Sequence, residues 1–326
     1  MKLLIFVGLF VSFGFTAFVG LAYLPIEKVY PSFEPLPITF RIDKNESIKS
    51  VSTRLKNEKL ILNSSLFEYV ARFRKLDKAI NYGEFSLIST MSIVDILTKI
   101  SSSSNLKYNI YIKNCITNWE LLNLMKEKQF LHDDLSNYSL EEGTLAPDTY
   151  IVSYKTRVSD FFKIMRAKQS EILIQEWNSR KPELPLHSQH ELLVLASMIE
   201  KEAATHSEMP IIASVFINRL RKKMRLQSDP TVSYGIDLGN LDKRKPLTKS
   251  DLRNATPHNT YRIPGLPISS ICNPSKSSIH AAANPIETDY LYFVMSEHGQ
   301  HVFSKTFYDH KRNVLKWRKF QSQSHR

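Results

Sequence analysis

The chain has 326 residues, of which 42% are hydrophobic and 11% aromatic, so it can bury a sizeable core and is not a disordered polypeptide. Its 44 Lys and Arg residues outnumber its 32 Asp and Glu residues, and the formal net charge of +12 suits an anionic partner such as nucleic acid, lipid headgroups or an acidic polymer. The two cysteines, Cys115 and Cys272, exclude a disulfide-rich scaffold and have no metal-ligand spacing, but they leave one bridge open.

An apolar run dominates the N-terminal region. Residues 3–24 carry no charge, and these 22 residues match the roughly 20 that a helix needs to span a bilayer. A cleavable signal peptide, the lesser alternative, has a shorter apolar core and a small-residue cleavage site. We therefore predict an uncleaved transmembrane anchor over residues 1–26. We expect a single-pass protein of the inner (plasma) membrane, with the remaining residues on the periplasmic, extracytoplasmic side. The only positive charges at the start of the run, the amino terminus and Lys2, determine this orientation weakly.

A small α+β module is expected after the anchor, over residues 27–105. It starts with the proline-punctuated spacer "PSFEPLP", and alternating or helical spacing of apolar residues then predicts its elements. The expected strands and helices cover residues 38–42, 46–61, 64–76, 83–89 and 92–100. The serine tract "SSSSN" at residues 101–105 marks the predicted domain boundary.

A larger, mostly helical domain is expected over residues 106–326. Its predicted strand and four helices cover residues 108–114, 118–130, 158–180, 188–204 and 209–224. Asn118 and Ser188 are the expected N-caps of two of these helices. Glu191 stands at the third helical position after Ser188, and Pro210 suits a first turn.

Two glutamates flank a lysine at the end of the helix predicted over residues 188–204. Glu200, Lys201 and Glu202 are about 100° apart around a helix, so at least one of them should lie near its apolar side. A carboxyl group in a partly desolvated cleft has a raised pKa, as a general acid requires near neutral pH. Glu200 has small alanine neighbours one turn away, which leave room for a ligand, so the pattern favours it slightly over Glu202. An exposed, non-catalytic helix end is the alternative.

Long segments of the chain carry a resemblance to a known family. They are "EGTLAPDTY", "LASMIEKEA", "ASVFINRLRKKMRLQSDPTVSYG", "NTYRIPGLPISSICNPSKSSIHAAANP" and "YLYFV". In order and spacing they resemble the YceG-like family of membrane-anchored endolytic murein transglycosylases, from the apolar run to about His310. The expected fold is therefore α+β, with a single N-terminal transmembrane helix, a small LysM-like module and a larger mixed α+β catalytic domain. The resemblance implies that Glu200, the first glutamate of the E-x-E pair, is catalytic.

The resemblance also implies a reaction. The β-1,4 bond between N-acetylmuramic acid and N-acetylglucosamine would be cleaved inside a glycan strand without water. Glu200 would protonate the glycosidic oxygen and then, as a carboxylate, help to deprotonate the C6 hydroxyl, which closes a 1,6-anhydro ring. Ordinary glycosidases need two carboxylates, whereas here the substrate supplies the nucleophile. Peptidoglycan strands close to the membrane are the implied substrate, and peptidoglycan synthases are implied partners.

The same resemblance marks polar residues for a sugar-binding cleft. The candidate substrate-binding residues are Asn218, Gln227, Asp229, Thr231, Tyr234, Asn259, Thr260, Tyr261 and Gly265. Asp229 precedes Pro230, so its plainest role is to cap a helix that begins at Pro230. Asn218 is equally suited to be a strut between a helix and a loop. Residues 259–267, "NTYRIPGLP", are expected to form a rigid loop that lines the cleft or only shapes it.

Two other functions account for part of the sequence. A non-catalytic, membrane-tethered peptidoglycan-binding scaffold would keep the basic charge and the small module but would not need an acid. A nucleic-acid-binding protein would account for the charge, but no nucleic-acid motif is visible and the expected anchor argues against it. His258, His280 and His310 show no ligand spacing, so neither a metal nor another cofactor is expected.

Overall fold

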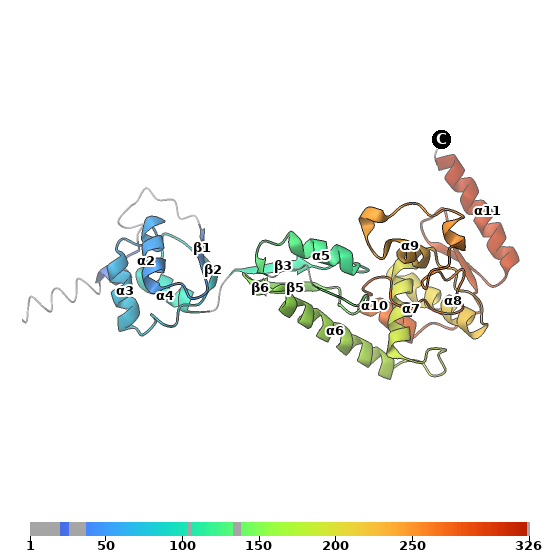
Figure 1. Ribbon diagram of the computed structural model, residues 1–326, viewed down its shortest axis with the longest axis horizontal. Helices are drawn as coiled ribbons and strands as arrows, with labels where there is room; N and C mark the ends of the chain where they lie inside the picture. The colour runs from blue at the N-terminus through green and yellow to red at the C-terminus, as the bar shows by residue number, and fades with distance from the viewer. Residues whose placement is uncertain (1–19, 26–36, 103–105, 133–137, 325–326) are drawn as a thin grey trace, which may run out of the picture. The chain divides into compact units, whose positions relative to one another are not determined.

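The computed structural model describes residues 20–25, 37–102, 106–132 and 138–324, and the chain divides into two compact units (Figure 1). The first unit comprises Met1–Asn109 and Ile151–Thr156. The second comprises Ile110–Tyr150 and Arg157–Arg326. The first unit therefore ends a few residues after the serine tract, where the sequence predicts the boundary. The later segment Ile151–Thr156 also belongs to the first unit.

The predicted transmembrane anchor lies mostly outside the described residues, which begin at Gly20. Most of the predicted spacer also lies outside them. In the part of the chain that is described, no helix combines the length and the apolar character needed to cross a membrane. The anchor therefore stays a prediction.

The first unit has the strand and helix order that the sequence predicts. Its elements are β1 (Ile38–Ile42), α2 (Ile48–Asn57), α3 (Ser64–Phe73), β2 (Gly83–Leu87) and α4 (Ile93–Ser101). The two strands pair antiparallel, with Ile38 opposite Leu87. Side-chain oxygens of Ser47, Asn63 and Ser92 accept hydrogen bonds at the three helix N-termini, so local signals fix where these helices begin.

The next elements along the chain are short strands and a capped helix, and three of these strands include residues assigned to both units. Strands β3 (Lys107–Tyr111) and β5 (Thr149–Ser153) form one two-stranded sheet, and β4 (Leu131–His132) and β6 (Thr156–Arg157) form another. Helix α5 runs over Asn118–Lys126. The prediction that Asn118 caps this helix is wrong by one residue. Thr117 is the N-cap and forms a capping box with Glu120, because its backbone is extended and its hydroxyl accepts from Glu120 N.

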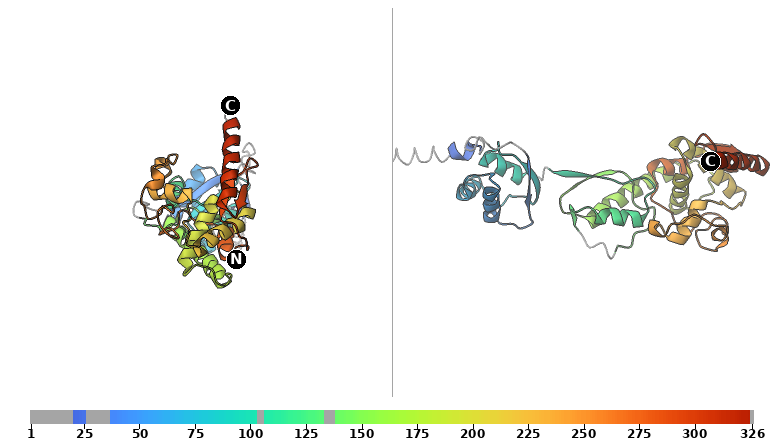
Figure 2. Two further views of the ribbon diagram at one scale, coloured as in Figure 1. Left: turned by 90° about the vertical axis from the view of Figure 1, so that its right-hand side faces the viewer. Right: turned by 90° about the horizontal axis from the view of Figure 1, so that it is seen from above.

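Among the described residues, six α-helices and a β-hairpin make up most of the rest of the second unit. They are α6 (Val158–Asn178), α7 (Gln189–Glu202), α8 (Met209–Arg221), α9 (Asp229–Asp237), α10 (Lys276–Ala283), β7 (Tyr292–Met295), β8 (His301–Ser304) and α11 (Phe307–Ser324). The sequence predicted α6, α7 and α8, with Ser188 as the cap of α7 and Pro210 in the first turn of α8. It did not predict α11, the red helix in Figure 2, which packs against the hairpin.

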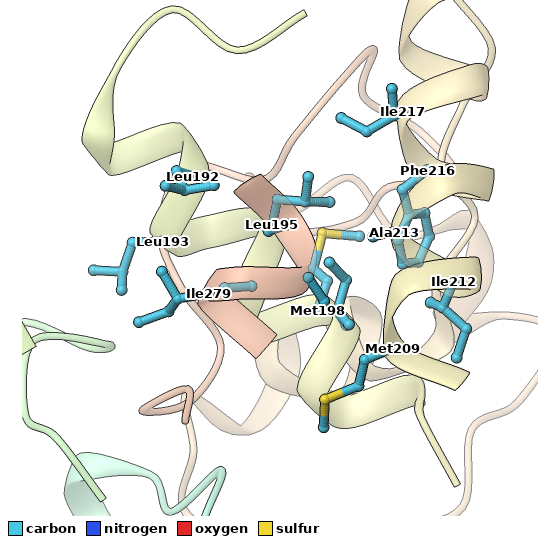
Figure 3. Close-up of a cluster of buried hydrophobic side chains, with 14 of the residues drawn as sticks. Leu192, Leu193, Leu195, Met198, Met209, Ile212, Ala213, Phe216, Ile217 and Ile279 are labelled. Carbon is cyan, nitrogen blue, oxygen red and sulfur yellow. The ribbon is translucent and has the colours of Figure 1, made fainter. Parts of the chain in front are cut away.

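Helix α7 passes through the core of the second unit. Every residue from Leu192 to Ile199 is buried. Apolar side chains of α7, α8 and α10 point toward one another in Figure 3, among them Met198, Phe216 and Ile279. A helix that is apolar on all sides belongs in a core. The glutamates at positions 200 and 202 therefore stand where the buried stretch of α7 ends.

A disulfide bond joins Cys115 to Cys272 across 157 residues, and their Cα atoms are 4.8 Å apart. The sequence left this pairing open. Next to the bond, Ile116 and Asn273 form an isolated antiparallel bridge, with Asn273 N donating to Ile116 O at 2.9 Å. The bond thus ties the segment before α5 to the segment that leads into α10.

Candidate functional site

Helix α7 ends at Glu202, and the following turn fixes how it ends. Ala203 is the C-cap, with an extended backbone, and its N–H still donates to Ile199 O. The next N–H group, that of Ala204, donates to Glu208 Oε2 at 3.1 Å. Both N–H groups that follow the last helical turn are therefore hydrogen-bonded. The side chains of Glu200 and Glu202 leave this turn in different directions.

The carboxylate of Glu200 contacts the start of α10. Its Oε2 accepts a hydrogen bond from Ser275 N at 3.0 Å and a second, short one from the hydroxyl group of Ser275. Ser275 is also the N-cap of α10, where its hydroxyl oxygen accepts from Ser278 N. Glu200 thus links the end of α7 to the start of α10, and it is partly buried.

The carboxylate of Glu202 lies against α9. Its Oε1 accepts from the hydroxyl group of Ser228 at 2.6 Å, and its side chain is partly buried. Burial raises the pKa of Glu202. The Ser228 hydrogen bond and the positive charges of His301 and Arg219 oppose that rise, whereas the negative charge of Asp229 adds to it. A carboxyl group in this setting holds its proton to higher pH than an exposed one, as a general acid must.

Three of the predicted substrate-binding residues join the start of α9 to the loop beside it. Thr231 and Thr260 are fully buried, and their hydroxyl oxygens are 2.9 Å apart. Ser228 N donates to Thr260 Oγ1 at 2.9 Å, and Gln227 N donates to Thr260 O at 3.2 Å. The two threonine hydroxyls are thus engaged within the protein, while the side chain of Gln227 is exposed.

Asp229 and Tyr261 form a second link between α9 and this loop. The hydroxyl group of Tyr261 donates to Asp229 Oδ1 at 2.6 Å. Burial, this hydrogen bond and the charges of Asp229 and Glu202 all raise the pKa of Tyr261. Asp229 is the first helical residue of α9 and not its N-cap, which is Ser228, so the predicted capping role is wrong. Its carboxylate instead accepts the hydrogen bond from the hydroxyl group of Tyr261.

Two predicted residues of this region shape loops. The side-chain amide of Asn259, which is fully buried, donates to the carbonyl oxygens of Asp251, Leu252 and Asn254 at 3.4, 3.2 and 2.6 Å. Gly265 has φ +73°, a conformation that side chains other than hydrogen disfavour, although an added Cβ would meet no atom within 4 Å. Both residues therefore have a backbone-shaping role in the rigid loop.

Asn218 is the strut that the sequence offered as an alternative. Its Nδ2 donates to Thr288 O at 2.7 Å and to Tyr290 O at 3.1 Å, which holds the chain after α10 against α8. It lines a polar pocket of about 570 Å³ together with Ser214, Arg221 and residues 285–289. Neither Glu200 nor Glu202 lines that pocket.

Tyr234 contacts a third carboxyl group, which the sequence did not single out. Its hydroxyl donates to Glu142 Oε2 at 3.2 Å. Glu142 is 9% exposed and also accepts from Asn118 N at 3.0 Å and from Asn273 Nδ2 at 3.3 Å. Burial raises the pKa of Glu142 to about 7, against the opposing effect of the Asn118 and Tyr234 hydrogen bonds. Glu142 thus titrates near neutral pH inside the unit.

The structure therefore separates the predicted site into two groups. The residues on the side of Glu202 are Gln227, Asp229, Thr231, Thr260 and Tyr261, together with Asn259, whose side-chain oxygen accepts from Tyr261 N at 2.9 Å, whereas Asn218 and Tyr234 have partners elsewhere. Sequence reasoning missed Ser228, Glu142, Glu208, His301 and Ser275, because their contacts join segments far apart in the chain and no local spacing signals them. Among the described residues, no cluster of His, Cys, Asp and Glu could hold a metal ion.

Comparison with known proteins places this arrangement in a family. A model described as the YceG-like family matches residues 40–316. The chain belongs to the YceG-like family. A YceG-like protein of Listeria monocytogenes, solved by crystallography, has 29% sequence identity and a TM-score of 0.52, and the match covers 86% of this chain and 99% of that one.

Two similar proteins carry the name endolytic murein transglycosylase. The Bacillus subtilis (strain 168) protein is 30% identical over 312 residues, covering 86% of this chain and 84% of that protein. A Streptococcus pneumoniae (strain D39) protein is 24% identical over 322 residues, covering 85% of this chain but 58% of its own length. In the YceG-like chain described here, the matched region includes both glutamates at the end of α7 and the polar residues around Glu202.

Proposed function

We propose that this chain is an endolytic murein transglycosylase, which is the name that its relatives in Bacillus subtilis and Streptococcus pneumoniae carry. The observation that carries the proposal is the carboxyl group of Glu202, whose pKa burial raises and which hydrogen-bonds Ser228 within a polar set. A non-catalytic scaffold has no need for such a group.

We propose Glu202 as the general acid, in preference to Glu200, which the sequence favoured. The protonated carboxyl group of Glu202 donates its proton to the glycosidic oxygen of the β-1,4 bond. This oxygen departs from C1 of N-acetylmuramic acid and stays with N-acetylglucosamine. The resulting carboxylate accepts the proton of the C6 hydroxyl group, whose oxygen attacks C1 and closes the 1,6-anhydro ring. One carboxyl group serves both steps because the attacking oxygen belongs to the sugar.

The proposed division of labour among the polar residues follows from their contacts. Gln227 and Asp229 are exposed, so their side chains can meet hydroxyl and acetamido groups of a glycan. Thr231, Thr260 and Asn259 are fully buried and support the loop that Tyr261 occupies. Glu200, bound to Ser275, positions α7 against α10.

We further propose that the enzyme acts outside the cytoplasm, anchored in the plasma membrane by the apolar run at residues 3–24. The disulfide between Cys115 and Cys272 supports this location, since such bonds persist in oxidising compartments. The β-α-α-β order of β1, α2, α3 and β2 is consistent with a LysM-like module that binds the same glycan. Action on nascent strands beside a synthase would follow from a short tether.

Product analysis tests the proposed function. Purified full-length protein in detergent is incubated with murein sacculi, and the released ends are identified by mass spectrometry. A lytic transglycosylase produces 1,6-anhydro-muramyl ends inside strands. Reducing muramyl ends would identify a hydrolase, and unchanged sacculi would leave only the scaffold function.

A further inference from the structure

Helix α11 carries a large excess of positive charge. Its 18 residues, Phe307–Ser324, include five Lys and Arg residues and one Asp. The longer helix α6 carries three Lys and Arg residues and three Asp and Glu residues, so its charges cancel. With five positive charges against one negative charge, α11 alone contributes four of the twelve net positive charges of the chain.

One face of α11 is held against the hairpin of β7 and β8. The ring of His310 stacks on that of Tyr292, with centroids 5.1 Å apart, and Asn313 Nδ2 donates to Ser304 Oγ at 3.1 Å. Trp317, one turn after Asn313, is also half-buried. These contacts determine which side of α11 faces the hairpin and which side faces solvent.

The side that faces solvent exposes large apolar side chains. Phe307, Tyr308 and Leu315 are 62%, 76% and 60% exposed. A helix turns by about 100° per residue, so Tyr308 and Leu315, seven residues apart, lie within about 20° of each other around the axis. A single exposed apolar side chain needs no explanation, but three on the outward side of one helix indicate an interaction surface.

Cations border this apolar strip on both sides. The same helical spacing places Lys311 and Arg318 on one side of it and Arg312 and Lys319 on the other. All four side chains are exposed. Asp309, the one acidic residue of α11, pairs with Arg312 at 3.6 Å, so the helix supplies no further acid to neutralise the other three cations. The apolar strip and its four bordering cations form the outward face of α11.

We propose that the outward face of α11 binds the surface of a bilayer that contains anionic phospholipids. Apolar and tyrosine side chains enter the interfacial region of such a bilayer, while Lys and Arg side chains reach the phosphate groups. An acidic polysaccharide or a nucleic acid would account for the cations but offers no apolar phase for Tyr308 and Leu315. This contact is separate from the predicted anchor at residues 1–26 and does not depend on the proposed role of Glu202.

A fluorescent dye on the outward face tests the proposal in the full-length protein reconstituted into vesicles. Ser322→Cys places an environment-sensitive dye seven residues after Leu315, on the same face, and the native cysteines are bonded to each other. Dye emission should shift to the blue in vesicles of phosphatidylglycerol and phosphatidylcholine, but not in phosphatidylcholine alone. High salt should reverse the shift, because it screens exposed charges. The same dye at Ser179→Cys, exposed at the end of α6, should not respond to the lipid.

Charge variants test whether the cations carry the contact. Lys311→Gln combined with Lys319→Gln removes one charge from each border, and the ratio of bound to unbound outward face should fall by roughly 10-fold or more. Lys222→Gln combined with Lys223→Gln is the matched control, since it removes two exposed charges at the end of α8 and should leave the blue shift unchanged. Thermal unfolding shows whether each variant folds, and salt reversal in otherwise unchanged protein decides the question if one does not.

Three results would overturn the proposal. The first is the same dye emission in both kinds of vesicle, and the second is a full blue shift in the folded Lys311→Gln, Lys319→Gln variant. The third is a response to a soluble acidic polysaccharide, heparin, without a response to phosphatidylglycerol, because the outward face would then bind a polymer and not a bilayer.

Discussion

The hydroxyl oxygen of Ser228 lies 2.6 Å from Glu202 Oε1, so the first turn of α9 is tied to the last turn of α7. Glu202 is partly buried, and the charges of Asp229, His301 and Arg219 act on its pKa. This contact distinguishes Glu202 from Glu200, whose carboxylate is bound to the start of α10. We assign proton transfer to Glu202.

Ser228→Ala removes the hydroxyl donor from Glu202. Because that hydrogen bond stabilises the carboxylate, its loss should raise the pKa of Glu202 further and weaken the step in which the carboxylate forms. A hydrogen bond to a charged group contributes about 1.5–3 kcal/mol, so anhydro-end release should fall by roughly 10-fold or more. The initial rate on sacculi measures the loss. A rate equal to that of the wild type would show that the contact has no role in catalysis.

Tyr261→Phe removes the donor to Asp229 while keeping the ring. The loop after α9 should loosen, and the free energy of unfolding should fall by about 1–2 kcal/mol, since the hydrogen bond reaches a carboxylate. Urea unfolding followed by circular dichroism measures this change. Tyr308→Phe is the matched control, because Tyr308 is 76% exposed on α11 and its variant should unfold as the wild type does.

Loss of the disulfide should destabilise the second unit. A bond that closes a loop of 157 residues constrains the unfolded chain, and removal of a native disulfide costs about 2–5 kcal/mol. Dithiothreitol should therefore lower the unfolding temperature of the wild type. A Cys115→Ser, Cys272→Ser double variant should already unfold at the lower temperature and should not respond to the reductant. An equal response of both proteins would contradict the bond.

Glu142 should make stability depend on pH. Its folded-state pKa is about 7, above the ordinary 4.5, so the folded state binds a proton more tightly than the unfolded state does. The corresponding stability is fully present below about 4.5 and is lost as the pH rises toward about 7, by roughly 3 kcal/mol in total. In Glu142→Gln this part of the pH dependence should disappear. Denaturant titrations between pH 4.5 and 8 measure the free energy of unfolding at each pH. If it changed with pH equally in both proteins, the raised pKa of Glu142 would be refuted.

Local signals made much of the fold predictable. Ser188 and Pro210 begin helices where the sequence places them, because a cap and a first-turn proline act within a few residues. At Asn118 and Asp229 the cap is the preceding residue, Thr117 or Ser228. Both residues of each pair are good caps, and the choice depends on which backbone is extended. That choice is made by distant contacts such as Asn118 N with Glu142.

The candidate site was less predictable than the fold. Helical spacing shows that Glu200 and Glu202 diverge, but it does not say which one meets α9 and which one meets α10. That depends on where residues 228 and 275 are placed by segments far away in the sequence. Likewise nothing near His301 signals its partner Glu208, since 93 residues separate them. The resemblance to family motifs indicated which segments form the site. Only the tertiary contacts distinguish the role of Glu202 from that of Glu200.

The most direct measurement compares Glu202→Gln with Glu200→Gln in the release of 1,6-anhydro-muramyl ends from sacculi, with both variants folded as judged by thermal unfolding. Glu202→Gln should abolish release, because an amide cannot donate and regain the proton. Glu200→Gln should retain most of the activity, because its amide oxygen still accepts from Ser275. Full activity of Glu202→Gln, or loss of activity in Glu200→Gln alone, would contradict the assignment.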